Sequence, residues 1–168
     1  MNCYVWLFPL IFIFHDMEEI IGFIPWLRQN ERKLKRYRRL IKTYDGVITE
    51  GFASAVFEEL FLCIAISAIS NLTDFYGVWL GGFIGCALHF VIHIVESIII
   101  GKYIPALITS VICLPVSAFI IYRCILILNC SVYELLIFAV VGIVLLALNL
   151  RFAHWIMRKV SGYFQKSN

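Results

Sequence analysis

The stretch FHDMEE at residues 14–19 decides how this chain folds, because it places four ionisable side chains inside an otherwise apolar segment. Residues 4–14 (YVWLFPLIFIF) overlap its start, and residues 20–27 (IIGFIPWL) follow it; neither stretch carries an acidic or basic residue. A charged side chain at the centre of a lipid bilayer costs roughly 2.5–3.5 kcal/mol on insertion scales. A segment that keeps such groups either uses them or neutralises them against partners elsewhere in the chain.

The composition of the whole chain is that of an integral membrane protein. Of the 168 residues, 62% are hydrophobic and 15% are charged, whereas soluble domains have about 45–50% apolar and about 25% charged residues. The apolar runs are about 20 residues long and do not alternate, so they predict helices rather than a closed barrel. We therefore expect an all-α fold, a polytopic membrane bundle of about five transmembrane helices in a single domain over residues 1–168. The predicted spans are residues 4–26, 48–70, 76–100, 105–127 and 133–157.

Basic residues are concentrated in one predicted loop. Residues 28–42 (RQNERKLKRYRRLIK) contain eight of the fourteen lysines and arginines. This composition is typical of a cytoplasmic loop under the positive-inside rule, and we prefer that interpretation to nucleic-acid binding. With the loop inside, five spans place the N-terminus outside and the C-terminus in the cytoplasm. We expect the protein to lie in the lipid bilayer of the cell membrane, with no nucleic acid as a partner.

Ionisable side chains are also concentrated within the predicted spans. All four histidines of the chain lie there, and six of its eleven acidic residues lie there more than two residues from a span end. The residues are His15, His89, His93, His154, Asp16, Glu18, Glu19, Glu58, Glu59 and Glu96. If the ionisable residues lay mainly in loops, the spans would contain almost none of them. This distribution therefore indicates a buried polar site.

Helical spacing sorts the polar residues of the first span. Residues three and four apart share one face of a helix, which places Glu18 and Glu19 on the face of His15. Asp16 points about 100° away from that face, and we interpret it as a supporting or interhelical hydrogen-bonding group.

The third and second spans contribute a matching set. His89, His93 and Glu96 stand at i, i+4 and i+7 and form a single stripe. Of the adjacent Glu58 and Glu59, only one can face the same target, and a neutral pair that joins helices is an alternative for them. The third span also opens with four glycines that allow close helix approach, Gly77, Gly81, Gly82 and Gly85.

These groups reach similar depths in the bilayer. At about 1.5 Å per residue from the outer end, His15 lies roughly 16 Å deep, and His89 and His93 lie roughly 18–25 Å deep. The carboxylates at residues 58–59 and the amide of Asn149 reach a similar layer. Three spans therefore carry imidazole and carboxylate groups to the middle of the membrane.

Imidazole and carboxylate together are ligands for zinc, non-haem iron and manganese. We expect one divalent metal, zinc or iron, and the ligand number also allows two ions. For His154, near the predicted cytoplasmic surface, we prefer a packing role. The predicted metal ligands are His15, Glu19, Glu59, His89 and His93. The predicted catalytic residues are Glu18 and Glu96, each as a base or an additional ligand.

Residues 15–19 read as H-x-x-E-E, and the chain resembles the HXXEE family of small membrane proteins. The resemblance extends from the first predicted span through the fourth, and relatives often have glycine where this chain has Ala106. It implies no established activity. It rests on residues 15–19 together with Glu58-Glu59, the stripe of His89 and His93, and Tyr103-x-Pro105-x-x-x-Thr109.

The leading functional hypothesis is an intramembrane metal-dependent enzyme that acts on a lipid-like substrate. A metal-activated water suits hydrolysis, and a di-iron site suits oxygen chemistry. Histidine and carboxylate chains also make proton or cation pathways, so a transporter is an alternative. A structural assembly protein, in which the polar groups only join helices, is the third reading.

Overall fold

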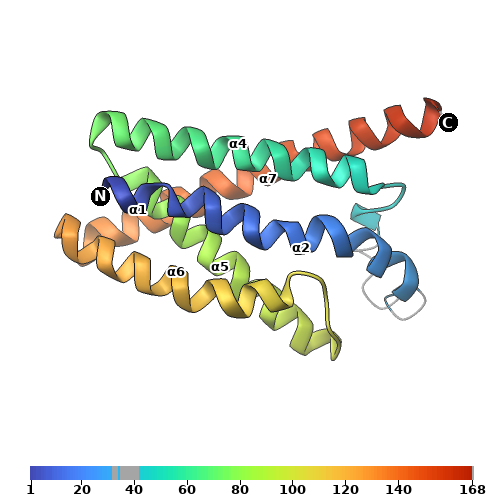
Figure 1. Cartoon of the computed structure of the whole chain (residues 1–168), viewed down its shortest axis with the longest axis horizontal. Coiled ribbons are helices and arrows are strands. Elements are labelled where there is room, and N and C mark those ends of the chain that lie inside the picture. Colours follow the sequence, from blue (N-terminus) through green and yellow to red (C-terminus); the bar gives the residue numbers. More distant parts are fainter. Residues whose placement is uncertain (32–33, 35–41, 168) are drawn as a thin grey trace.

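The computed structural model describes residues 1–31, 34 and 42–167, so most of the basic loop predicted at residues 28–42 lies outside the described residues. Within the described part, the chain is helical and contains no strand, which confirms the predicted all-α bundle (Figure 1). The helices are α1 (Asn2–Val5), α2 (Leu7–Asn30), α4 (Thr49–Thr73), α5 (Gly77–Ile100), α6 (Leu107–Leu128) and α7 (Val132–Ser167).

Four of the described helices, α4, α5, α6 and α7, are long and apolar enough to cross a membrane. Helix α2 has 24 residues, which at about 1.5 Å per residue also exceeds the hydrocarbon thickness of about 30 Å. It differs from the other four because it carries three carboxylates near its middle, those of Asp16, Glu18 and Glu19, whereas α4 carries two, those of Glu58 and Glu59. The protein is therefore a membrane protein, and α2 is its polar long helix.

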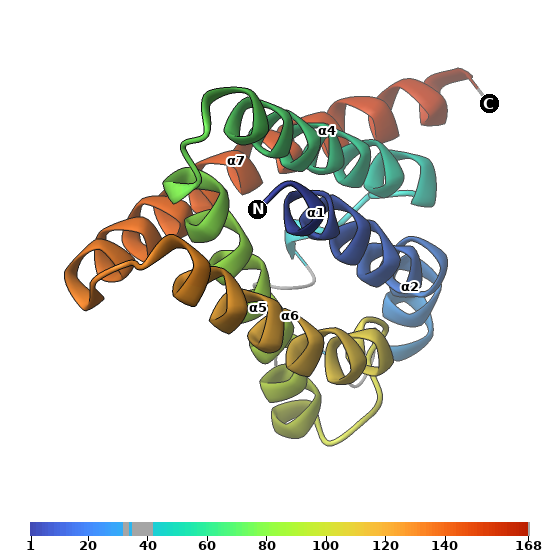
Figure 2. The ribbon, with the colours of Figure 1, turned by 60° about the vertical axis from the view of Figure 1, so that its left-hand side comes forward.

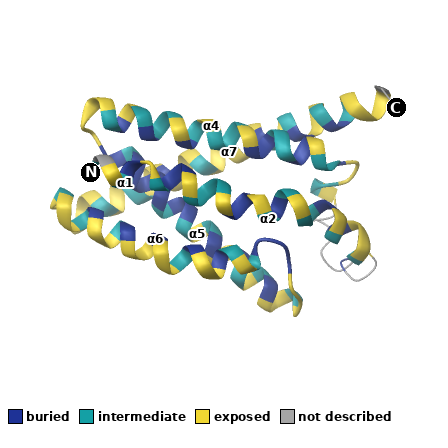
Figure 3. Ribbon diagram, viewed as in Figure 1, coloured by how far each residue is buried: buried dark blue, intermediate teal, exposed yellow. Residues whose placement is uncertain are grey.

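The helices form an up-and-down bundle. Helix α2 packs against α4 and α6, α5 packs against α6 and α7, and α7 packs against α4. Figure 2 shows α2 between α4 on one side and the α5–α6 pair on the other. Apolar side chains are exposed over much of α6 and α7, as expected for helices that face lipid (Figure 3).

Two apolar clusters lie on either side of the polar residues of α2. One is built around Phe8, Trp79 and Phe83, and the other around Ile24 and Met157. Since Phe8 and Ile24 flank residues 15–19 along α2, the polar segment is enclosed between two packed apolar layers.

Helix α7 extends ten residues beyond the end predicted at residue 157. Its last turns pack against the segment that precedes α4. Ser161 accepts a hydrogen bond from the backbone N–H of Ile48 at 3.3 Å, and the side chain of Gln165 donates to the carbonyl of Gly46 at 2.8 Å. These tertiary contacts, which hydropathy does not register, continue the helix through the polar tail.

Candidate metal centre

Four side chains from two helices converge in the middle of the bundle. His15 and Glu19 come from α2, and His89 and His93 come from α5. One ligand atom of each lies within 4.8 Å of the ligand atoms of the other three. Spacing at i, i+4 puts each pair on one helix face, and the packing of the bundle brings the two faces together. We call these four residues the His–Glu cluster.

The Nε2 atom of His93 has two close polar neighbours, and a metal ion at this position would account for both contacts. Its Nε2 lies 2.9 Å from Oε1 of Glu19 and 2.8 Å from Nε2 of His89. An imidazole nitrogen carries at most one hydrogen, and one hydrogen cannot make two linear hydrogen bonds. A cation among these three atoms accepts a lone pair from each of them, so the geometry fits a metal site.

His15 points a free nitrogen atom into the protein. The residue is 0% exposed, and its Nε2 has no hydrogen-bond partner among the described residues. Its ring lies 5.4 Å from the ring of His89 and 5.2 Å from that of His93, measured between centroids. A buried nitrogen without a partner is costly, and metal coordination removes that cost.

A hydrogen-bond chain fixes which nitrogen of His15 is free. The hydroxyl of Thr109 lies 2.7 Å from Oε2 of Glu18 and 3.0 Å from Nδ1 of His15. Because the hydroxyl has a single hydrogen and a carboxylate only accepts, Thr109 donates to Glu18 and accepts from the Nδ1–H of His15. The ring is therefore held with its lone pair on Nε2, as metal-binding histidines commonly are.

Glu18 holds α2 against the start of α6. Its Oε2 also accepts the backbone N–H of Thr109 at 2.8 Å, and its Oε1 accepts the hydroxyl of Tyr103 at 2.5 Å. Burial and the hydrogen bond to Glu18 raise the pKa of Tyr103 to about 12, so the phenol keeps its proton and donates. With three donors on its carboxylate, Glu18 is placed to position His15, while its predicted role as a base stays a prediction.

The other predicted site residues lie around the His–Glu cluster. Oε2 of Glu96 lies 3.6 Å from Nδ1 of His93, and its side chain is 45% exposed. Glu59 is outside the group of four and lies close enough to Glu58, Glu19 and Asp16 for their charges to interact. Its role as a ligand therefore stays a prediction.

Asp16 is more central than its helical phase suggests. It is 2% exposed, and its Oδ1 lies 3.8 Å from Nε2 of His15. Because α2 packs against α4 and α6 on different sides, successive residues of this helix are both covered. The signal that points to Asp16 in the sequence is the cost of any carboxylate in an apolar span.

Thr109 and Tyr103 were not among the predicted site residues. In the sequence they stand out only through the Tyr-x-Pro stretch, which lies far from the histidines along the chain. Their relation to Glu18 depends on how α6 packs against α2 and is not visible from spacing alone.

Fold and site together define a helical membrane protein with a buried histidine–carboxylate cluster that can hold a metal ion. The family model described as "Protein of unknown function with HXXEE motif" matches residues 6–120. This segment is more than half of the chain, so the protein belongs to the HXXEE family. It contains the whole His–Glu cluster together with Tyr103 and Thr109. No curated protein and no solved structure matches the chain.

Proposed function

We propose that the protein is an intramembrane metal-dependent enzyme that acts on a lipid-like substrate. The observation that carries the proposal is the convergence of four ligand atoms from the His–Glu cluster within 4.8 Å of one another. Such a group, enclosed by apolar layers at the middle of the bundle, is poorly explained by helix packing alone. The lone pairs of His15 and His93 support the same conclusion.

Three imidazoles and one carboxylate suit a divalent ion of the first transition series, and zinc and iron are the proposed metals. Four ligands are sufficient for one ion, which favours a mononuclear hydrolytic centre over a di-iron centre. Glu59 is proposed as a further ligand, because its carboxylate lies near that of Glu19 and a cation between two carboxylates offsets their repulsion.

Different residues of the chain have different proposed roles in the reaction. A bound divalent metal polarises a substrate oxygen and lowers the pKa of a coordinated water. Thr109 and Glu18 orient His15, while Glu96 faces Nδ1 of His93 and is partly exposed. Glu96 is therefore the proposed base that exchanges a proton with the surroundings.

Metal analysis of the purified protein tests the proposal. After purification in detergent without chelators, we expect about one equivalent of zinc or iron per chain, as for a site with a full ligand set. His89→Ala and His93→Ala should each lose most of this metal. His154→Ala is the matched control, since His154 is outside the cluster and should leave the metal content unchanged.

Size-exclusion chromatography and circular dichroism show whether each variant keeps its fold. Wild-type protein that contains no stoichiometric transition metal after expression in zinc- and iron-supplemented medium would overturn the proposal. Metal that is retained in both histidine variants would do the same.

We also propose that the N-terminus lies outside and the C-terminus in the cytoplasm of the cell. The alternation of the helices places the ends of α2, α5 and α7 and the starts of α4 and α6 on one side (Figure 1). By the positive-inside rule this is the cytoplasmic side. Its basic residues in the described part of the chain include Arg28, Lys42, Lys102, Arg158, Lys159 and Lys166.

A further inference from the structure

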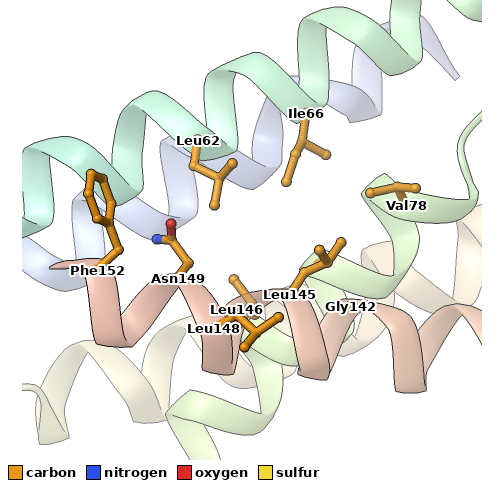
Figure 4. A pocket seen from close by; sticks show the side chains of 10 residues that line it. Leu62, Ile66, Val78, Gly142, Leu145, Leu146, Leu148, Asn149 and Phe152 are labelled. Atoms are coloured by element: carbon orange, nitrogen blue, oxygen red, sulfur yellow. The ribbon is translucent and has the colours of Figure 1, made fainter.

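A groove on the outer surface of the bundle lies between α4, α5 and α7. Its volume is about 390 Å³, within the range of about 300–1,000 Å³ that is typical of small-molecule sites. Figure 4 shows Leu62 and Ile66 of α4 facing the side chains of α7, with the amide of Asn149 pointing into the space between them. All three helices cross the membrane, so the groove is open to hydrocarbon rather than to water.

Asn149 is the one polar side chain among the lining residues, and Glu58 lies beside the groove as its hydrogen-bond partner. The amide nitrogen of Asn149 donates to Oε2 of Glu58 at 3.1 Å. Among the described residues, no donor reaches Oδ1 of Asn149 or Oε1 of Glu58. An acceptor at membrane depth without a donor is costly, because lipid chains offer no hydrogen bond. Both free atoms are acceptors, so the missing partner is a donor.

We propose that this groove binds the chain of a single-chain amphiphile whose hydroxyl or amine group donates to Asn149 and Glu58. The apolar walls accept the hydrocarbon chain, and the two free oxygen atoms select a donor headgroup over an alkane. The amphiphile enters from the bilayer past Leu145 and Phe152, which are exposed on α7.

A second groove on the bundle provides a comparison, because its walls are apolar and lack such a polar pair. It lies between α5 and α6, has a volume of about 320 Å³, and is lined by apolar residues and Tyr122. It has no carboxylate–amide pair, so it serves as an internal reference for unselective contact with lipid chains.

Binding to the groove does not depend on the proposed function, because none of the residues that carry it belongs to the His–Glu cluster. Glu58 is nevertheless the neighbour of Glu59, whose charge interacts with Glu19.

Photo-crosslinking of the full chain in lipid nanodiscs tests the inference. The probes are three diazirine-bearing C16 compounds: an alcohol, an amine and an alkane. We expect the alcohol, the amine or both to label the α4 and α7 peptides of the groove at least about fivefold more than the alkane, the ratio for one hydrogen bond of about 1 kcal/mol. Unlabelled hexadecanol or hexadecylamine should compete, and labelling should persist after treatment with a chelator.

Three variants and one matched control locate the site. Leu145→Trp fills the groove and should abolish the selective labelling. Ile143→Trp should not, although Ile143 is 42% exposed and Leu145 is 41% exposed on the same helix. Asn149→Leu should reduce alcohol labelling to the alkane level, and Glu58→Gln should weaken labelling by the amine more than labelling by the alcohol.

Equal labelling of the groove by all three probes in wild-type protein would overturn the inference, as would selective labelling that Leu145→Trp leaves intact. Selective labelling that is lost together with the metal would instead place the bound headgroup at the His–Glu cluster and also overturn it. Because the wild-type comparison needs no variant, the inference is testable even if a substitution prevents folding.

Discussion

A single hydroxyl, that of Thr109 at the start of α6, hydrogen-bonds to α2, the helix that carries two of the proposed metal ligands. It donates to Glu18 and accepts from His15, so both residues of the H-x-x-E spacing act through one atom. The motif therefore combines a proposed metal ligand, His15, with the carboxylate of Glu18, which positions it through Thr109. Glu19, the last residue of the motif, faces His93 instead.

Replacement of Thr109 tests this role. Thr109→Val removes the hydroxyl, frees the ring of His15 to change tautomer, and should weaken metal affinity about 10–100-fold, as loss of a supporting group commonly does. Thr109→Ser keeps the hydroxyl and should bind metal like the wild type. Affinity is measured by competition with a chromophoric chelator, and equal affinity of the valine and wild-type proteins would contradict the assignment.

Ala106 adopts a backbone conformation that favours glycine. Its φ is +93° at the residue before α6, and left-handed backbone costs a residue with a Cβ roughly 1–2 kcal/mol. Ala106→Gly should therefore raise the free energy of unfolding by about 1 kcal/mol. Ala118→Gly, within α6, should lower it by about 0.5–1 kcal/mol. Thermal unfolding in detergent measures both, and a change of the same sign in the two variants would exclude the explanation.

At the scale of the elements, α5 and α7 approach each other through glycine. A Cβ on Gly142 would collide with the backbone of Gly81, and one on Gly81 would collide with the carbonyl of Phe138. Small residues at such a crossing allow backbone contact between membrane helices. Of the four glycines predicted to permit close approach in the third span, Gly77, Gly81 and Gly85 therefore face α7, whereas Gly82 faces Phe8 of α2.

Gly142→Ala should destabilise this crossing by about 1–3 kcal/mol, because the backbone of Gly81 cannot move aside as a side chain would. Gly162→Ala is the control on the same helix, since no atom lies within 4 Å of the added Cβ. It should leave stability unchanged or raise it by up to about 1 kcal/mol through helix propensity. Unfolding in mixed micelles measures both, and equal destabilisation would show that the effect is not one of packing.

At the scale of the whole molecule, the proposed orientation places Cys3 and Cys130 on the outer side. Cys3 is exposed and Cys130 is partly exposed, whereas Cys63, Cys86, Cys113 and Cys124 are buried. A membrane-impermeant maleimide should therefore label intact cells at Cys3 and Cys130. Cys3→Ser and Cys130→Ser separate the two signals.

A cysteine introduced by Lys166→Cys near the C-terminus should react only after the membrane is permeabilised. Labelling of this position in intact cells, with none at Cys3, would show the opposite orientation. The chemistry of the His–Glu cluster would be unaffected by that result, because it lies between the two surfaces.

Local periodicity and composition determined much of this protein from the sequence alone. Apolar runs of bilayer length impose helices, since the backbone must satisfy its own hydrogen bonds in lipid. The i, i+4 spacing put His15 with Glu19 and His89 with His93, because helical phase depends only on neighbours along the chain. These pairs are the two halves of the cluster that the structure brings together.

Only the tertiary structure decided how these two residue pairs come together and which other residues surround them. Several features join separate helices or depend on how the helices pack. They are the burial of Asp16, the contact of Thr109 with His15 and Glu18, the approach of Gly81 to Gly142, and the polar pair of Glu58 and Asn149. Helical phase shows which residues share a face of one helix, but it does not show which neighbouring helix covers that face. That choice follows from the packing of the whole bundle, where side-chain volume and hydrogen bonding across helices are satisfied together.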